Sequence, residues 1–231
     1  ERSVGLGVMG FHSYLQQHSI PLESVMSKAW NKKIFKHIQQ HVDQASKDLA
    51  DERGPCPDAA DYGCNERFSN KTAIAPTASI SIICGGASPG VEPVAANSYT
   101  HKTLSGSFNV RNRYLVELLE KHGKNTDDVW SGITTNQGSV SHLDFLTDLE
   151  KDVFKTAFEL DQKWIIELSG DRTPYISQAQ SINLFVPADI HKRELHKIHF
   201  DAWKKGLKSL YYCRSKSIQR AENVNDTKAT D

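Results

Sequence analysis

The last third of the sequence alternates between strand-like and helix-like patterns, and this alternation constrains the fold more than any other feature. Residues 181–186 carry apolar side chains at every second position, which is the spacing of a strand, and Pro187 ends the run. Asp189 suits the N-cap of a following helix that extends to about Leu207, and residues 209–214 form the next strand. This order predicts an α/β unit with parallel strands and a right-handed crossover.

Upstream, apolar residues that recur three to five positions apart predict a long amphipathic helix over residues 21–52. Two more helices are expected over residues 110–122 and 148–169, each followed by a glycine. Residues 72–84 mix isoleucines with Thr, Ser and Ala, and we interpret them as a loop that runs into a buried strand or a short helix. The first ten residues are glycine-spaced and lack an initiator Met, as expected for the interior of a longer polypeptide.

The balance of charge argues against polyanionic partners. Lys and Arg total 28 and Asp and Glu also total 28, so no net positive charge would draw the chain onto nucleic acid or an anionic membrane. No apolar run approaches the roughly 20 residues that span a bilayer. These features predict a soluble, cytoplasmic protein.

The four cysteines form no C-x-x-C pair, and a chain of this size does not need a disulfide framework, so reduced thiols are expected. A zinc site built from Cys56 and Cys64 with His12 or His101 is conceivable, but the spacing matches no structural zinc pattern. His142 is a further histidine near a structured segment, yet no H-E-x-x-H or Ser-His-Asp arrangement is present. The residues therefore predict neither a metal ion nor a complete catalytic set.

Small and hydroxyl-bearing side chains gather in residues 75–81, which read Ala-Pro-Thr-Ala-Ser-Ile-Ser. Side chains this small leave backbone N–H groups accessible, and together with the hydroxyls they can form a nest for phosphate oxygens. A turn whose hydroxyls satisfy nearby backbone groups explains the same composition. The sequence pattern leaves both interpretations open.

Tyr211 and Tyr212 are adjacent in a predicted strand, where neighbouring side chains point to opposite faces. One interpretation is a core tyrosine beside a surface tyrosine. The other is a local bend that stacks the two phenols, so that their hydroxyls can exchange protons and electrons with a third group. Glu92 lies in a glycine-rich stretch and is expected to be solvated.

Four blocks of the sequence, taken in order, resemble the large subunit of ribonucleotide reductases. The first two are Arg-Ser-Val-Gly-Leu-Gly-Val-Met-Gly-Phe at residues 2–11 and Ala-Pro-Thr-Ala-Ser at residues 75–79. The third is Ser-Pro-Gly-Val-Glu-Pro at residues 88–93, with Leu-Ser-Gly-Ser-Phe at residues 104–108. The fourth is Gln-Ser-Ile-Asn at residues 180–183, followed by residues 199–208 and by Leu-Tyr-Tyr at residues 210–212.

The resemblance implies an α/β fold that is rich in helix. In this family a ten-stranded α/β barrel surrounds a central finger loop, and the chain corresponds to the later strands and their helices. Residues 1–217 are thereby assigned to the C-terminal portion of the catalytic barrel domain. Residues 218–231 are polar and are expected to form a flexible tail.

The resemblance also implies roles for particular residues. In this family the Pro-Thr-Ala-Ser segment binds the diphosphate of the nucleotide substrate, and in class I enzymes a tyrosine pair passes an oxidising equivalent to a catalytic cysteine. The residues that match the diphosphate segment are Pro76, Thr77, Ala78, Ser79 and Ile80. Tyr211 and Tyr212 match the tyrosine pair. The catalytic cysteine and its partners correspond to positions upstream of residue 1.

We therefore expect the C-terminal part of a class I ribonucleoside-diphosphate reductase large subunit, which reduces ribonucleotides to deoxyribonucleotides by a radical mechanism. The implied partners are an N-terminal large-subunit fragment with the catalytic cysteines, a metal-containing small subunit that supplies the radical, the ribonucleoside diphosphate, and thioredoxin or glutaredoxin. No cofactor is expected on this chain. Two alternatives stay open: an adenosylcobalamin-dependent class II enzyme, disfavoured by the tyrosine pair and the basic segment 214–220, and a non-catalytic domain that binds nucleotides or partners.

Overall fold

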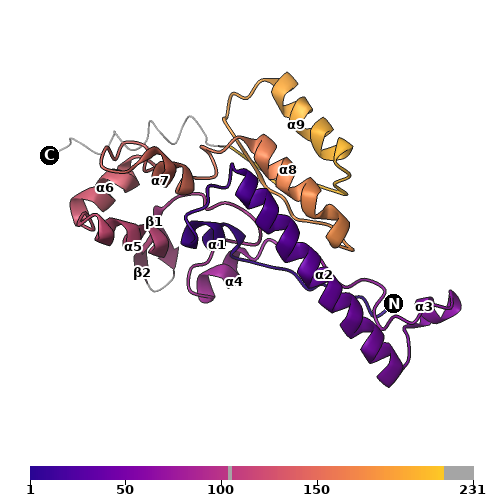
Figure 1. The fold of residues 1–231 in the computed structure, drawn as a ribbon. Helices are drawn as coiled ribbons and strands as arrows, with labels where there is room; N and C mark the ends of the chain where they lie inside the picture. Colours follow the sequence, from indigo (N-terminus) through magenta and orange to yellow (C-terminus); the bar gives the residue numbers. More distant parts are fainter. Residues whose placement is uncertain (104–105, 216–231) are drawn as a thin grey trace.

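The computed structural model describes residues 1–103 and 106–215 (Figure 1). The predicted tail, residues 218–231, lies outside the described residues, as do most of the basic segment 214–220 and residues 104–105. The strands are β1 (Ser98–Thr103), β2 (Gly106–Arg111), β3 (Leu184–Val186) and β4 (Cys213–Ser215). The helices are α1 (Phe11–Gln17), α2 (Val25–Arg53), α3 (Pro57–Asp61), α4 (Ala78–Ile83), α5 (Arg113–Lys121), α6 (Asp127–Thr135), α7 (Asp148–Val153), α8 (Gln162–Arg172) and α9 (Lys192–Lys204). Within these ranges, none of the helices combines the length and apolar character needed to cross a membrane.

The predicted strand, helix, strand unit is confirmed as β3, α9 and β4. β3 and β4 pair in parallel, with Leu184 opposite Cys213 and Val186 opposite Ser215. The predicted start of each of the three elements was wrong: β3 begins at Leu184 instead of residue 181. β4 begins four residues later than predicted, and the N-cap of α9 is His191, whose side chain accepts the Arg193 N–H at 3.1 Å, in place of Asp189.

The parallel arrangement continues upstream of β3 through shorter extended segments. Leu6 forms a parallel bridge with Thr72, and Ile74 forms one with Gln180. The chain therefore places residues 4–6, 72–74, 180–186 and 211–215 side by side in that order, each hydrogen bonded to the next. The register of this ladder determines at which point along the strands each connecting loop begins.

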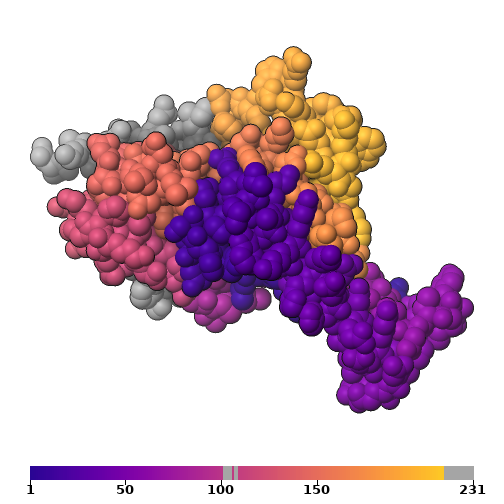
Figure 2. All heavy atoms as spheres, in the orientation of Figure 1, coloured from indigo at the N-terminus to yellow at the C-terminus, as the bar shows by residue number. Residues whose placement is uncertain are grey.

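The predicted long helix is confirmed as α2, which begins after Ser24 and ends before Gly54. The Ser24 hydroxyl caps the first turn by accepting the Ser27 N–H, and Gly54 leaves the helix at a φ of 77°, which favours glycine. The C-terminal half of α2, together with α3, projects from the rest of the molecule as an arm (Figure 2).

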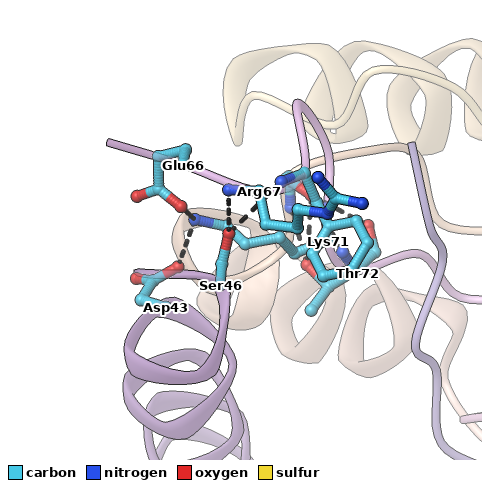
Figure 3. A network of polar contacts seen from close by, with 8 residues as sticks. Asp43, Ser46, Glu66, Arg67, Lys71 and Thr72 are labelled. Atoms are coloured by element: carbon cyan, nitrogen blue, oxygen red, sulfur yellow. Dashed lines mark hydrogen bonds and ion pairs between the residues drawn. The ribbon is translucent and has the colours of Figure 1, made fainter. Parts of the chain in front are cut away.

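A polar network holds the chain that returns from this arm against α2 (Figure 3). The Lys71 ammonium lies 2.7 Å from Asp43 of α2 and 3.2 Å from Glu66. Burial alone would lower the pKa of Lys71, but hydrogen bonds to Asp43 and Glu66 outweigh it and raise that pKa. The Ser46 hydroxyl accepts the Arg67 N–H at 3.2 Å, so α2 positions the segment that leads into the extended residues 72–74.

The helix predicted over residues 148–169 is wrong, because the chain forms α7 and α8 with a break between them. Thr147 and Glu150 form a capping box that starts α7. In the break, Glu159 accepts the Thr156 N–H at 2.8 Å and the Ala157 N–H bonds to the Val94 carbonyl. The apolar spacing carries on across the break, although Val153 and Phe154 pack in one apolar cluster and Leu160, Ile165 and Leu168 in another.

The helix predicted over residues 110–122 begins only at Arg113, because β1 and β2 pair as an antiparallel hairpin that the sequence analysis missed. Tyr99 pairs with Val110, and Ser98 pairs with Arg111 at the open end. Asn112 then caps α5 by accepting the Tyr114 N–H at 3.1 Å. This cap and the hairpin fix the start of the helix.

The core between α2, α8 and the ladder contains a buried arginine. Arg172 is 1 % exposed and donates to Gln180 at 2.7 Å, Asn31 at 2.8 Å and Ser169 at 3.0 Å. Its guanidinium also lies 5.7 Å from the Phe11 ring and 5.5 Å from the Phe35 ring. Burial lowers the pKa of Arg172 to about 9, partly opposed by the charge of Asp171, so the side chain remains a cation at neutral pH.

We predict that Arg172→Met lowers the free energy of unfolding by about 3 kcal/mol, because it leaves buried oxygens of Asn31, Gln180 and Ser169 without a donor. Urea unfolding measures the change. The control is Arg193→Met on the exposed face of α9, which should alter stability by no more than about 0.5 kcal/mol. Equal stability of the two variants would contradict a structural role for Arg172.

Candidate functional site

The hydroxyl-rich turn leaves the ladder directly after Ile74 and leads into α4. Thr77 is the N-cap of α4 and adopts a left-handed conformation, with φ 50°. Its hydroxyl oxygen accepts the Gly90 N–H at 2.7 Å, which leaves the hydroxyl proton available to a ligand. Ala78, Ser79 and Ile80 form the exposed first turn of α4, whose N–H groups have no partner within the helix.

The structure decides between the two forms expected for residues 72–84. The short helix is confirmed as α4, while the expectation of a buried strand is wrong. Ile80 is 55 % exposed and Ile83 is 84 % exposed, so the isoleucines of α4 do not build the core. A cavity of about 290 Å³ lies between α4 and the β1–β2 hairpin, with Ser81 and Tyr99 in its lining.

Tyr211 and Tyr212 lie just before β4, where the chain is not yet a regular strand. Their ring centroids are 4.1 Å apart at an interplanar angle of 51°. Both are half exposed, so the interpretation as one core and one surface tyrosine is wrong. The two phenols are therefore in contact with each other on the surface.

The electrostatic surroundings of Tyr211 favour its neutral phenol because they raise its pKa. A hydrogen bond with the Tyr212 side chain raises the pKa of Tyr211, the Tyr212 charge raises it further, and Arg214 opposes these effects. The Arg214 guanidinium lies 5.8 Å from the Tyr212 ring centroid. Tyr211 is therefore a neutral phenol at neutral pH, and its one-electron oxidation is accompanied by the loss of its proton.

Glu92 is buried, contrary to the expectation that it is solvated. It is 7 % exposed, and its Oε1 has no hydrogen-bond partner among the described residues. Burial raises the pKa of Glu92, while hydrogen bonding from Asn183 and the charge of Arg214 oppose that rise. The sequence signal for this residue is its place in the Gly-Val-Glu-Pro run that follows the hydroxyl-rich turn.

The residues considered for a zinc site do not form a cluster in the described structure. Cys56 is buried and Cys64 is exposed, and all four cysteines are free thiols. His12 is 1 % exposed, and its Nδ1 accepts the Val94 N–H at 3.0 Å. The His101 side chain lies outside the described parts, and His142 is exposed. Among the side chains that the structure describes, no three of His, Cys, Asp or Glu form a metal-binding group.

The sequence matches the family described as "Ribonucleotide reductase, barrel domain" over residues 1–62 and 58–213. The chain belongs to this ribonucleotide reductase family. The α/β barrel fold and the family resemblance expected from the four sequence blocks are thereby confirmed. Ladder, turn and tyrosine pair are parts of this barrel domain.

Individual ribonucleotide reductases are similar to the chain over nearly all of its length. It is 49 % identical over 229 residues to the ribonucleoside-diphosphate reductase large subunit of Invertebrate iridescent virus 6, covering 97 % of the chain and 24 % of that protein. It is 45 % identical over 233 residues to the protein of that name from Invertebrate iridescent virus 3, covering 100 % and 37 %. The chain therefore spans well under half of the length of these relatives.

A solved ribonucleotide reductase has the same fold. The class Id ribonucleotide reductase alpha subunit of Actinobacillus ureae superimposes with a TM-score of 0.87 at 40 % sequence identity. The match covers 94 % of this chain and 39 % of that one.

We predict that the barrel domain loses stability in acid because of His12. Burial lowers the pKa of His12 to about 4, so the folded protein favours neutral imidazole, whereas the unfolded chain binds the proton near the ordinary pKa of 6.5. The stabilisation is complete above pH 6.5 and falls as the pH drops towards 4, by ~3 kcal/mol.

Unfolding measured from pH 7.5 to 4 in the protein and in His12→Asn checks this expectation. The Asn carbonyl can still accept the Val94 N–H but does not titrate, so the decline with pH should be shallower. His199→Asn, at an exposed position in α9, is the control and should keep the full decline. Parallel curves for all three proteins would rule out His12 as the cause.

Proposed function

We propose that the chain is part of a class I ribonucleoside-diphosphate reductase large subunit, which reduces ribonucleoside diphosphates to deoxyribonucleotides by a radical mechanism. The contact between the Tyr211 and Tyr212 rings carries the proposal, because a relay by successive oxidation needs two redox-active groups close together. The likeness to a class Id alpha subunit supports class I over the cobalamin-dependent alternative.

In this proposal the hydroxyl-rich turn binds the diphosphate of the substrate. The N–H groups of Ala78, Ser79 and Ile80 donate to phosphate oxygens, as the first turn of a helix does, and the Thr77 hydroxyl adds a donor. Pro76 ends the extended segment and directs the turn outward. The exposure of the α4 first turn and the left-handed conformation of Thr77 support this assignment.

The tyrosine pair relays the oxidising equivalent. A small subunit with a metal centre oxidises one phenol, which gives up an electron and a proton together. That phenol regains both from the second phenol, which in turn oxidises a catalytic cysteine in the part of the large subunit outside this chain. In this proposal the radical comes from the small subunit and not from a cofactor on this chain, and a thioredoxin or glutaredoxin dithiol supplies the two electrons of each turnover.

We predict that Tyr212→Phe, made in the large subunit that contains this chain, reduces turnover with the small subunit to the background rate. Phenylalanine keeps the ring but has no hydroxyl to lose a proton, so the relay stops while substrate binding is preserved. Tyr62→Phe, at the exposed C-cap of α3, should retain full activity. A Tyr212→Phe enzyme with normal turnover would refute the relay and favour a cobalamin-dependent or non-catalytic role.

We also predict that Gly90→Ala raises the dissociation constant for a ribonucleoside diphosphate about tenfold. Gly90 has φ 51°, and an added Cβ would lie 2.9 Å from the Ala75 carbonyl oxygen, so the turn must shift. Gly86→Ala is the matched control because its φ is 71° but its Cβ would meet nothing within 4 Å. Calorimetric titration measures both, and equal affinities would contradict the assigned diphosphate site.

A further inference from the structure

Glu92 is a buried carboxylate that belongs neither to the proposed diphosphate turn nor to the proposed tyrosine relay. It follows Gly90 in the 88–94 loop, whose backbone is fixed on two sides. On one side, the Gly90 N–H bonds to the Thr77 hydroxyl at 2.7 Å. On the other, the Val94 N–H bonds to His12 at 3.0 Å. The loop therefore holds Glu92 at a set distance from the diphosphate turn.

Asn183 connects this loop with the tyrosine pair. It is 2 % exposed, and its side-chain oxygen accepts the Tyr212 N–H at 3.0 Å. The neighbouring backbone bonds run from the Tyr211 N–H to the Ile182 carbonyl at 2.8 Å and from the Leu184 N–H to the Tyr212 carbonyl at 2.9 Å. Asn183 thus supplies the acceptor for the one backbone N–H of the pair that the ladder does not satisfy.

The orientation of the Asn183 amide depends on the hydrogen-bond partner of its NH2 group as well as on that of its oxygen. An amide can present either its oxygen or its NH2 group in a given direction, whereas an ionised carboxylate can only accept. Because the Asn183 oxygen accepts the Tyr212 N–H, the NH2 group is the half of the amide that is left to hydrogen bond with Glu92. The charge of Arg214, which acts on both Glu92 and Tyr211, favours a carboxylate at this position.

We infer that Glu92 is a positioning residue of the tyrosine pair: it fixes the amide of Asn183, which holds the Tyr212 backbone, and so joins the pair to the diphosphate turn. Its consequence for turnover rests on the proposed function, whereas its consequence for the Tyr212 backbone does not. These two consequences can be measured separately.

Two substitutions separate the acceptor from the bulk of the side chain. Glu92→Met keeps a side chain of similar length without an acceptor, and Glu92→Gln keeps an oxygen that can accept from Asn183. Glu66→Met is the matched control, because Glu66 is a partly buried carboxylate beside Lys71 in the network of Figure 3, far along the chain from the pair.

Hydrogen exchange of the Tyr212 amide, followed by mass spectrometry of peptides over residues 209–215, tests the inference without enzyme activity. Exchange should be about tenfold faster in Glu92→Met, and within about threefold of the unsubstituted protein in Glu92→Gln and Glu66→Met. Unchanged exchange in Glu92→Met would overturn the inference. Equal acceleration in Glu92→Gln and Glu92→Met would also overturn it, because the acceptor would then be irrelevant.

Steady-state kinetics of the large subunit with its small subunit tests the functional consequence. In Glu92→Met, kcat should fall about tenfold, with the KM for a ribonucleoside diphosphate within about twofold, since relay geometry and not binding is disturbed. Glu92→Gln should restore most of kcat. A raised KM with unchanged kcat would overturn the inference in favour of substrate binding. Faster amide exchange with unchanged kcat would support the positioning role and count against the relay itself.

Discussion

The guanidinium of Arg172 is buried away from water, so its N–H groups need hydrogen-bond acceptors from within the protein. Gln180 lies at the start of the segment that becomes β3, Asn31 lies on α2 and Ser169 lies on α8. A buried cation with only neutral acceptors is costly unless all of them are in place. The cation therefore fixes three elements from distant parts of the sequence relative to one another. The ladder that carries both proposed sites is built on this arrangement.

The register of the ladder explains why distant motifs meet. Ile74 is bridged to Gln180, so the turn that begins after Ile74 leaves the ladder beside Ser181. The Tyr211 N–H bonds to the Ile182 carbonyl one strand further along, so the turn and the tyrosine pair flank neighbouring residues of the same segment. A shift of one strand by two residues would change the distance between them along the ladder by about 7 Å.

The sequence correctly predicted the elements that are determined by the pattern of neighbouring residues. Repeated apolar spacing located α2 and the β3–α9–β4 unit, and the hydroxyl-rich run located the turn at Thr77. It failed where a tertiary contact decides the outcome. The 154–161 break preserves a helical apolar stripe and is set by the bond from Ala157 to Val94. Glu92 looked solvated because its burial comes from chain that lies ninety residues away in the sequence.

The arm formed by the end of α2 and by α3 has room for a change in chain length. Added side chains at Gly54 and Gly63 would meet nothing within 4 Å, in contrast to the tight approach at Gly90. The match to the barrel-domain family also divides at residues 58–62, in α3. Segments can therefore be gained or lost at the end of the arm while the ladder stays in register.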